Sequence, residues 1–341
     1  MATIKDVARE ADVSIATVSY VLNESGAVSE STRQRVLQTV KKLGYRPSII
    51  AQNLQARESR IIGYSWQPVP PDQFNPIVEK FMLGMAEAAA RHSYHVLVLP
   101  TTELTDEVNP YREMVESGRV DGFILSNTNL NDPRVRYLLD EGFPFVAFGR
   151  SNPEWEFPWV DVDGADGVGQ AVNHLLGLGH RRIACLAWPE HSLTGQYRLA
   201  GYHCAMGDAG LQVEPEWVIR TENSHYHAYE ATQTWLALPS EQRPTAVVAL
   251  TDLMAIGVIN AASAAGLEVG VDLAVVGFDD APVAGYLQPS LTSLRQPIVD
   301  IGERVVTMLI DLVRGEVPVP AQVLLKPRLI VRNSTAFGGR T

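Results

Sequence analysis

Charged and polar side chains stand where several apolar, strand-like runs of this sequence end. They are Thr251 and Asp252 after residues 245–250, Asp279 after residues 273–278, and Arg198 in the stretch after residues 182–188. A guanidinium and a carboxylate together can hold vicinal hydroxyls through charge-assisted hydrogen bonds. These positions therefore predict a site for a polyhydroxylated ligand. The alternative for Arg198 and Asp279 is a structural salt bridge, and Asp252 fits a helix N-cap better than a ligand contact.

Aromatic residues occur in or beside the same predicted loops. The set comprises Trp66, Phe74 with its neighbour Asn75, Trp188, Tyr197, His225 and Tyr226. Pyranose rings bind against aromatic faces, so these residues favour a carbohydrate ligand. A purine would stack in the same way, and any single member of the set could instead belong to the core. The sequence therefore indicates a sugar without excluding a purine.

Sequence motifs of catalysis and of metal binding are absent. There is no Gly-x-Ser-x-Gly, no His-Glu-x-x-His and no phosphate-binding glycine-rich loop. Asp161, Asp163 and Asp166 lack the spacing and the final glutamate of a calcium loop, so this segment is predicted to turn the chain and cap the next helix. Cys185 and Cys204 lack metal-type spacing and are predicted to be core thiols. We therefore expect a non-enzymatic protein without a cofactor or a metal.

Short apolar runs alternate with amphipathic segments from Ile61 onward. The expected strands are residues 61–66, 95–100, 120–126, 143–149, 182–188, 217–221, 245–250 and 273–278, with helices near 76–92, 110–117 and 133–141. Strands separated by helices form parallel sheets with right-handed crossovers, and two such sets imply two doubly wound subdomains. Ligands bind beyond the carboxyl ends of such strands. The predicted site therefore lies in the cleft between the subdomains.

The first sixty residues have a different pattern and a different charge. Helical periodicity predicts one helix after Thr3, a second from Ser14 to about Asn23, and a third that opens at Ser29 and Ser31 and stops at Gly44. Two helices joined by a tight turn are typical of a helix-turn-helix, although an ordinary helical bundle has the same spacing. Residues 1–60 hold nine Lys/Arg and six Asp/Glu, a net charge of +3, whereas the remainder of the chain carries −14. A cationic head on an acidic body favours a polyanion-binding module.

Four segments of this head, DVAREADVSIATVSYVLN, VSESTRQRV, LGYRPS and AQNL, resemble the LacI/GalR family of transcriptional repressors. The resemblance extends almost to the C-terminus. It implies an N-terminal all-α helix-turn-helix head and an α/β periplasmic-binding-protein-like body of two doubly wound parallel-sheet subdomains. Within the body, Arg198 matches the ligand-binding arginine of an Arg-x-x-Gly motif, and Asp279 matches the aspartate of GFDD. Thr251 replaces an asparagine of some relatives, which weakens any transfer of sugar identity.

The resemblance also implies roles in DNA binding. Ser14, Thr17, Ser19 and Asn23 resemble groups that contact or position phosphates, while Ile15, Ala16 and Tyr20 occupy base-reading positions. Tyr20 departs from the arginine common in relatives, so the operator base opposite it is in doubt. Leu54 lies where the family has a leucine that wedges between base pairs in the minor groove, and a linker leucine packed on the body is the alternative.

The expected domains are a DNA-binding head (1–46), a hinge helix or linker (47–60) and an effector-binding and dimerisation domain (61–341). The N-subdomain would take about 61–159 plus 292–320, and the C-subdomain about 160–291 plus 321–337. Residues 290–297 are expected to cross back to the N-subdomain, where a helix over 298–314 packs.

These expectations together describe a repressor of carbohydrate-utilisation genes. It would bind double-stranded operator DNA of pseudo-palindromic sequence as a homodimer, and a small sugar in the cleft would release it. The sequence has no apolar run of about 18 residues and no signal-peptide core, which predicts a cytoplasmic protein without a membrane partner. The alternatives are a purine- or nucleoside-responsive regulator that uses a corepressor and a solute-binding protein without a regulatory role.

Overall fold

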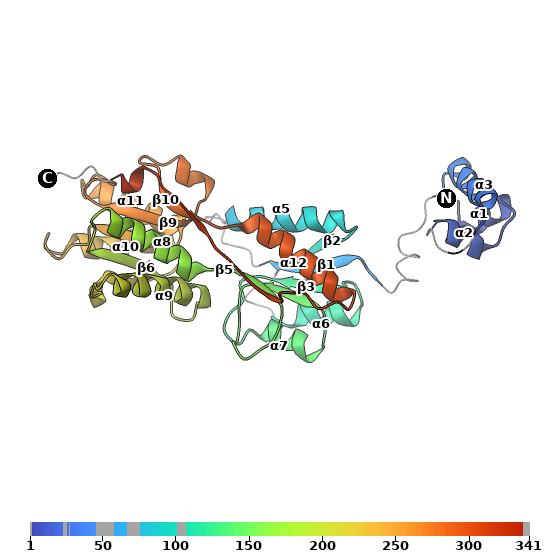
Figure 1. Ribbon diagram of the computed structural model, residues 1–341, viewed down its shortest axis with the longest axis horizontal. Helices are drawn as coiled ribbons and strands as arrows, with labels where there is room; N and C mark the ends of the chain where they lie inside the picture. The colour runs from blue at the N-terminus through green and yellow to red at the C-terminus, as the bar shows by residue number, and fades with distance from the viewer. Residues whose placement is uncertain are drawn as a thin grey trace. The chain divides into compact units, whose positions relative to one another are not determined.

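The computed structural model describes residues 2–22, 26, 28–45, 58–66, 76–100 and 107–336. The chain divides into two compact units, Met1–Arg60 and Ile61–Thr341 (Figure 1). Four of the predicted site residues, Asn23, Leu54, Phe74 and Asn75, lie outside the described residues.

The first unit contains the three predicted helices, α1 (Ile4–Glu10), α2 (Ile15–Leu22) and α3 (Glu30–Leu43). Their buried valines and alanines form one small core. Thr3 caps α1 in a capping box with Asp6, and Gly44 ends α3 in the left-handed conformation that a glycine C-cap favours. These caps confirm the predicted start of α1 and the predicted end of α3.

The turn between α1 and α2 contains a residue with a left-handed backbone. Asp12 has a φ of 48°, a conformation that Asp tolerates better than most residues. Ser14 then caps α2, because its Oγ accepts a hydrogen bond of 3.0 Å from the backbone N–H of Thr17. This turn fixes the start of α2 and thereby the set of side chains that α2 exposes.

The first sheet of the second unit consists of six parallel strands in the order β11-β5-β4-β3-β1-β2. Its strands are β1 (Ile61–Trp66), β2 (His95–Pro100), β3 (Gly122–Leu125), β4 (Phe145–Phe148), β5 (Trp159–Val162) and β11 (Gln322–Leu325). Helices α5 (Pro76–Arg91) and α12 (Ile298–Val313) share the core of one face, and α6 (Asn109–Glu116) and α7 (Pro133–Asp140) share that of the other. This is the predicted doubly wound arrangement.

Helices α5 and α12 pack side by side against the first sheet (Figure 1). Glycines permit the close approach, since a Cβ added at Gly84 would lie 2.5 Å from the backbone oxygen of Val299. Across the same contact, a Cβ added at Gly302 would lie 2.7 Å from the backbone oxygen of Phe81. The predicted packing of the helix near 298–314 on the first subdomain is therefore confirmed.

The second sheet has the order β12-β10-β9-β8-β6-β7, and only β12 runs antiparallel to its neighbour. Its strands are β6 (Ile183–Ala187), β7 (Val218–Arg220), β8 (Ala246–Ala249), β9 (Ala274–Asp279), β10 (Thr292–Arg295) and β12 (Arg328–Ile330). Helices α8 (Gly164–Gly177) and α9 (Leu193–Asp208) cover one face, and α10 (His225–Leu236) and α11 (Asp252–Ala264) cover the other. The described part of this unit also contains three short 3₁₀ segments, Pro215–Trp217, Pro282–Gly285 and Asn333–Thr335.

The chain crosses between the two sheets at different places from those predicted. β5 and β11 pair with each other in the first sheet, although residues 160–162 and 322–325 were predicted in the C-subdomain. β10 pairs with β9 in the second sheet, although residues 292–295 were predicted in the N-subdomain. The crossings therefore follow β5, β10 and β11. Strand pairing satisfies the backbone groups of these short segments, and the apolar pattern does not show which sheet provides the partner.

The structure also bears on the predictions for Asp163, for the two cysteines and for membrane-spanning segments. Asp163 caps α8 as predicted, because its side chain accepts from the backbone N–H of Asp166. Cys185 is buried as predicted, but Cys204 is exposed on α9 and is not a core thiol. Among the helices that the structure describes, none is both long and apolar enough to span a membrane.

Candidate functional site

A cavity of about 410 Å³ lies at the carboxyl ends of the strands of both sheets. The first subdomain lines it with Tyr64, Ile77, Val78, Phe81, Ser126, Asn127, Thr128, Phe148, Gly149, Asp161 and Val162. The second lines it with Trp188, Thr194, Arg198, Asn223, Thr251, Asp252, Leu253, Ile256, Asp279, Ala281 and Val283, and Gln296 follows β10. Its volume falls within the range of roughly 300–1,000 Å³ that is common for small-molecule sites. The cavity is therefore the candidate ligand site.

Arg198 reaches the cavity from α9 and is buried. Its Nη1 donates to the backbone oxygen of Leu250 at 2.5 Å, and its guanidinium carbon lies 3.6 Å from the centre of the Phe278 ring. Burial lowers the pKa of Arg198, and the nearby carboxylates of Asp279, Asp161 and Asp252 oppose that shift. The guanidinium is thus fixed by contacts on one side.

Two buried N–H groups of this site have no hydrogen-bond partner among the described residues. They are Nε of Arg198 and Nε1 of Trp188, whose ring centre lies 5.1 Å from the guanidinium carbon. A buried donor without a partner costs about 1–3 kcal/mol. Both residues line the cavity, so acceptor atoms of a bound ligand can complete these bonds.

Asp279 ends β9 and Asp280 follows it, and both residues have positive φ angles, 123° and 49°. Asp279 lines the cavity and accepts from Nε2 of Gln296 at 2.6 Å. Burial raises the pKa of Asp279 to about 6, although Arg198, Gln296 and Lys80 act in the opposite direction. A hydroxyl donor of a ligand would therefore stabilise its ionised form.

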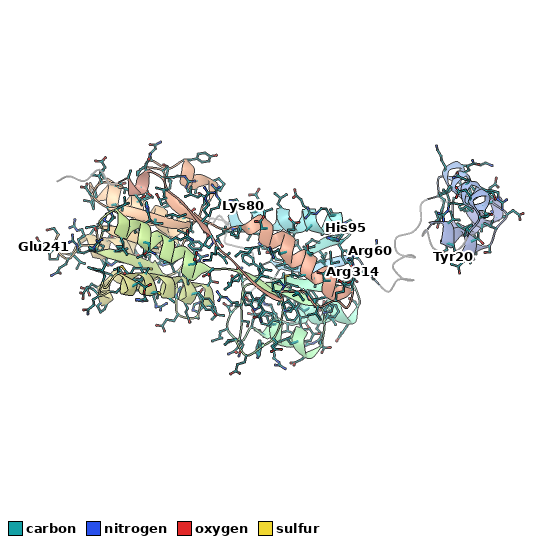
Figure 2. The ribbon with its side chains drawn as sticks, viewed as in Figure 1. Tyr20, Arg60, Lys80, His95, Glu241 and Arg314 are labelled. Carbon is teal, nitrogen blue, oxygen red and sulfur yellow. The ribbon has the colours of Figure 1, made fainter. Side chains whose placement is uncertain are left out.

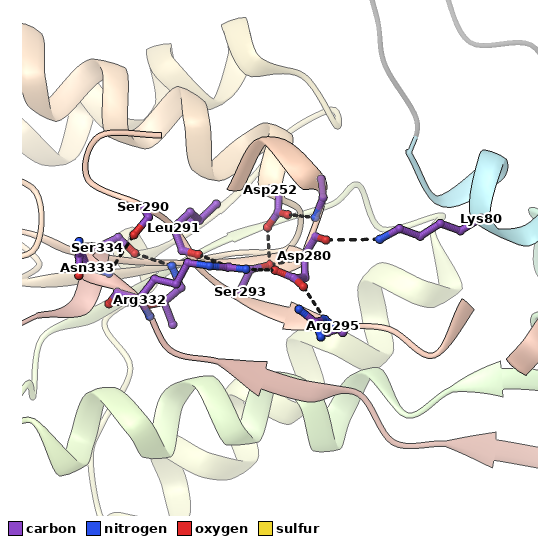
Figure 3. A network of polar contacts seen from close by, with 12 residues as sticks. Lys80, Asp252, Asp280, Ser290, Leu291, Ser293, Arg295, Arg332, Asn333 and Ser334 are labelled. Carbon is purple, nitrogen blue, oxygen red and sulfur yellow. Dashed lines mark hydrogen bonds and ion pairs between the residues drawn. The ribbon is translucent and has the colours of Figure 1, made fainter. Parts of the chain in front are cut away.

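Asp280 is an anchor rather than a cavity group. It accepts from Nε of Arg295 at 2.5 Å and from Nη2 of Arg332 at 2.6 Å, as Figure 3 shows. Burial acts to raise the pKa of Asp280, but its bonds with the two arginines lower the pKa overall. This network ties the end of β9 to β10 and to Arg332, which follows β12 by two residues. It thereby fixes the position of Asp279.

The predicted helix cap of α11 was assigned to the wrong residue. Thr251 has extended backbone angles and caps the helix, since its Oγ1 accepts from the backbone N–H of Met254 at 3.2 Å. The same hydroxyl donates to Oδ1 of Asn223 at 2.7 Å. Asp252 lies inside the first turn, where its buried carboxylate accepts from Oγ of Ser293 at 2.5 Å and from the backbone N–H of Ala281 at 2.7 Å. Both Thr251 and Asp252 line the cavity.

Several cavity residues were missed by the sequence analysis. Asp161 of β5 lines the cavity and accepts from Nε of Arg150 at 2.7 Å. Burial raises its pKa, and the positive charge of Arg150 opposes that shift. Asn127 follows β3 and Asn223 follows β7, so the rule of strand ends that found Asp279 could have found both.

Only some of the predicted aromatic residues line the cavity. Trp188 lines the cavity, whereas Trp66, Tyr197, His225 and Tyr226 do not. Tyr197 lies under the Arg150 guanidinium at 3.5 Å, and Tyr226 is exposed and donates to Glu230. The ring of His225 contacts Asn260 on the neighbouring helix, with 2.8 Å between Nε2 and Nδ2. Side chains of the predicted loops therefore supply one aromatic group to the described cavity wall.

The aromatic wall of the cavity comes instead from the first subdomain. Phe81 of α5 lies 5.0 Å from Phe148 and 5.6 Å from Tyr64, measured between ring centres. These three rings line the cavity together with the polar groups of the second subdomain. The arrangement offers apolar ring faces and charged hydrogen-bonding groups to one ligand.

In the first unit, α2 exposes the side chains that were predicted to read bases. Ile15 is 45% exposed and Tyr20 is 50% exposed, and Ala16 is exposed beside them. Tyr20 lies on the outside of this unit (Figure 2) and also approaches Gly26, where an added Cβ would be 3.2 Å from the ring. Val18 and Val21 occupy the opposite, buried side of the helix. Ser14 is also exposed, while Thr17 and Ser19 are half-buried.

A helix-turn-helix head joined to a two-subdomain body with a ligand-sized cavity defines a class, the ligand-responsive DNA-binding proteins. Comparison with known proteins supports this conclusion for both parts. Residues 3–48 match the family described as bacterial regulatory proteins, lacI family, and residues 172–335 match a periplasmic binding protein-like domain.

Three similar proteins cover nearly the whole chain. The HTH-type transcriptional repressor CytR of Escherichia coli strain K12 is 33% identical over 98% of this chain and 96% of its own length. The structure of a complex of the transcriptional regulator CelR with cellobiose is 30% identical, with a TM-score of 0.74, and covers 98% of this chain and 100% of that one. The lac repressor dimer bound to operator and the anti-inducer ONPF is 27% identical, with a TM-score of 0.81, and covers 98% and 99%. The chain belongs to the lacI family of bacterial regulatory proteins and is a DNA-binding transcriptional repressor.

Proposed function

We propose that this repressor binds a pseudo-palindromic operator as a homodimer and is released when a small carbohydrate occupies the cavity. It would thereby control genes of carbohydrate utilisation. The observation that carries the proposal is a pair of buried donors, Nε of Arg198 and Nε1 of Trp188, that find no hydrogen-bond partner in the described part of the chain. They lie in a cavity that the Asp279 carboxylate also lines. Buried polar groups are satisfied in nearly all native proteins, so the site is built for a ligand with hydrogen-bonding oxygens.

A sugar matches the mixed character of the cavity. Its hydroxyls can donate to Asp279 and accept from Arg198, while its apolar ring face can lie against Phe81 or Phe148. The CelR complex supports this assignment, because that similar regulator was solved with cellobiose. A purine base would use the same rings but would leave fewer hydroxyls for the charged pair.

Ligand binding would act on the relative orientation of the two subdomains. Asp161 belongs to the first sheet and Arg198 to a helix of the second subdomain, so one ligand can contact both. Such a ligand favours one arrangement of the subdomains only if it binds that arrangement more tightly than the other. In our proposal the arrangement favoured by the sugar no longer holds the hinge segments, residues 47–60, of the two protomers in register.

At the DNA, Ile15, Ala16 and Tyr20 would contact base edges, since α2 exposes all three. Ser14, Thr17, Ser19 and Asn23 would contact phosphates, and Leu54 would wedge into the minor groove. The lac repressor structure supports a dimer on its operator. The expected operator is symmetric, because a two-fold dimer reads two related half-sites.

The experiment has two parts and uses the full chain. Footprinting on genomic fragments should reveal a symmetric protected sequence, and a thermal-shift screen of sugars, nucleosides and purines should identify the effector, since a ligand specific to the native state raises the melting temperature. Stabilisation by hypoxanthine or a nucleoside but by no sugar would overturn the carbohydrate assignment. The absence of any symmetric footprint, with or without ligands, would overturn the operator assignment.

Arg198→Met tests the site itself. Methionine keeps an apolar contact with Phe278 but removes the donors, so the response to the sugar should be lost while effector-free operator binding persists. Arg136→Ala is the matched control, because Arg136 is an exposed arginine paired with Asp140 on α7. A full sugar response in Arg198→Met would remove Arg198 from the site.

A further inference from the structure

We infer that Arg150 and Tyr197 form a latch that joins the two subdomains of the body and holds them in the arrangement described above. Tyr197 was predicted to face a ligand, but it does not line the cavity. The latch gives this residue a different role. It goes beyond the proposed function, because it concerns the body itself and is the same whether the cavity takes a sugar or a purine.

The two residues belong to different subdomains. Arg150 follows β4 of the first sheet by two residues, whereas Tyr197 lies on α9, which covers the second sheet. The guanidinium carbon of Arg150 lies 3.5 Å from the centre of the Tyr197 ring. Cation–π contacts extend to about 6 Å, so this guanidinium lies directly against the ring face. The contact therefore joins the subdomains instead of stabilising either one alone.

Arg150 is fixed within the first subdomain. Its Nε donates to Oδ2 of Asp161 on β5 at 2.7 Å, and the two side chains are only 19% and 11% exposed. Its backbone oxygen accepts from Oγ1 of Thr128 at 2.8 Å. Because both the backbone and the guanidinium are held in this way, Arg150 cannot follow Tyr197 if α9 moves. The contact with the ring therefore depends on the relative position of the subdomains.

Tyr197 is fixed just as firmly to the second subdomain. Its helix packs closely on α8, since a Cβ added at Gly201 would lie 2.2 Å from the backbone oxygen of Ala165. Tyr197 also immediately precedes Arg198, which lines the cavity opposite Asp161 of the first sheet. The latch thus sets the separation of two polar groups that one ligand can contact. Such preorganisation lowers the free-energy cost of binding.

The other connections between the subdomains constrain their orientation less. The chain crossings that follow β5, β10 and β11 keep the subdomains together but allow rotation about single segments. Lys80 of α5 donates to the backbone oxygen of Asp280 at 3.5 Å, which is long for a hydrogen bond (Figure 3). The Arg150 guanidinium makes a closer contact and has a buried ionic partner. We therefore assign the larger effect on orientation to the latch.

The test measures the distance between the subdomains in the full-length protein by double electron–electron resonance. One spin label is attached to the natural Cys204, which is exposed on α9, and Cys185 is buried and does not compete for the label. The other is attached at Arg314→Cys, an exposed position at the end of α12 on the first subdomain (Figure 2). Labelled chains are mixed with an excess of unlabelled protein, so that the measured distances lie within one chain.

Tyr197→Leu is the primary variant, because it leaves the ion pair of Arg150 with Asp161 in place. It should raise the population of a second distance, relative to the first, by roughly threefold to thirtyfold, the effect of losing one cation–π contact. Arg150→Met should give the same second distance, and Tyr197→Phe should keep the original distribution because it keeps the ring.

Tyr137→Leu is the matched control, since the Tyr137 ring lies 5.7 Å from the guanidinium carbon of Arg112 within the first subdomain. Its distance distribution should equal that of the parent protein. An unchanged distribution in Tyr197→Leu, or an equal change in Tyr137→Leu, would overturn the latch. Neither effector nor operator enters the measurement, so such a result would leave the proposed function intact.

Discussion

Replacing Asp279 by asparagine should stabilise the ligand-free body while abolishing its response to the effector. Asparagine has nearly the size of aspartate and keeps an oxygen to accept from Nε2 of Gln296. It removes the charge that burial disfavours. The buried charge of Asp279 thus lowers the free energy of unfolding of the ligand-free body, and a bound ligand offsets this loss. The Asp279→Asn variant measures its size.

The magnitude follows from the pKa of Asp279. The ordinary value of 3.8 rises to about 6 in the folded protein, and at about 1.4 kcal/mol per pKa unit the ionised carboxylate destabilises the fold by up to about 3 kcal/mol. Because the folded state holds the proton more tightly than the unfolded state, stability falls as pH rises from about 4 through 6. The gain of Asp279→Asn should therefore be about 3 kcal/mol near pH 8, about half of that near pH 5, and close to zero below about pH 4.

Urea unfolding followed by tryptophan fluorescence measures this gain, because all six tryptophans lie beyond residue 60 and report only the body. The control is Asp140→Asn. Hydrogen bonding from Arg136 lowers the pKa of that exposed aspartate, so its replacement should bring no gain at about pH 8. If Asp279→Asn lowers stability near pH 8, or if its gain is the same at every pH, then Asp279 is not a buried carboxylate with a raised pKa.

Three other predictions concern packing and the DNA-binding region. Gly201→Ala should lower the free energy of unfolding in urea by about 2–4 kcal/mol, because the added Cβ would lie 2.2 Å from a backbone oxygen of α8. Gly207→Ala on the same helix should raise the free energy of unfolding by up to about 1 kcal/mol, because its added Cβ has nothing within 4 Å. A cost at both sites, or at neither, would contradict close packing of α8 on α9. Ser14→Ala should destabilise the head by about 1 kcal/mol in thermal circular dichroism, because Thr17 loses its capping acceptor; an unchanged melt would show that the cap is dispensable. Leu54→Ala should weaken operator binding more than nonspecific DNA binding in titrations, and equal losses would contradict the wedge.

Much of the fold was predictable because apolar runs mark strands that are buried on both faces. β1, β3, β6, β8 and β9 all have that pattern. Four strands, β5, β10, β11 and β12, are absent from the expected set. β5 carries Asp161 in its centre, and β11 is an edge strand with alternating exposure. Short strands interrupted by charge or half-exposed at an edge lack the apolar signal.

A missed strand explains one of the missed site residues, Asp161. Asp161 belongs to the cavity only because β5 joins the first sheet with its carboxyl end toward the second subdomain. In the sequence it reads as part of an acidic turn, VDVDGADG, in which Asp163 does act as a helix cap. By comparison, Thr251 and Asp279 directly follow the uninterrupted apolar runs 245–250 and 273–278, so the rule of strand ends placed both at the cavity.

Trp66, Tyr197, His225 and Tyr226 lie away from the described cavity wall for a different physical reason. Loop aromatics such as Tyr197 and Tyr226 were predicted to face the ligand because loops surround the cleft, yet an arginine and an exposed helix surface provide their contacts. Phe81 and Tyr64 have the periodicity of ordinary core residues, and both pack in the core of the first subdomain. A helix or strand that ends at the cleft has one continuous apolar face. Most of that face packs in the core, but the residues nearest the cleft contact the ligand instead. Periodicity reports that the face is buried, but only the position of its end relative to the sheet edge determines which rings line the cavity.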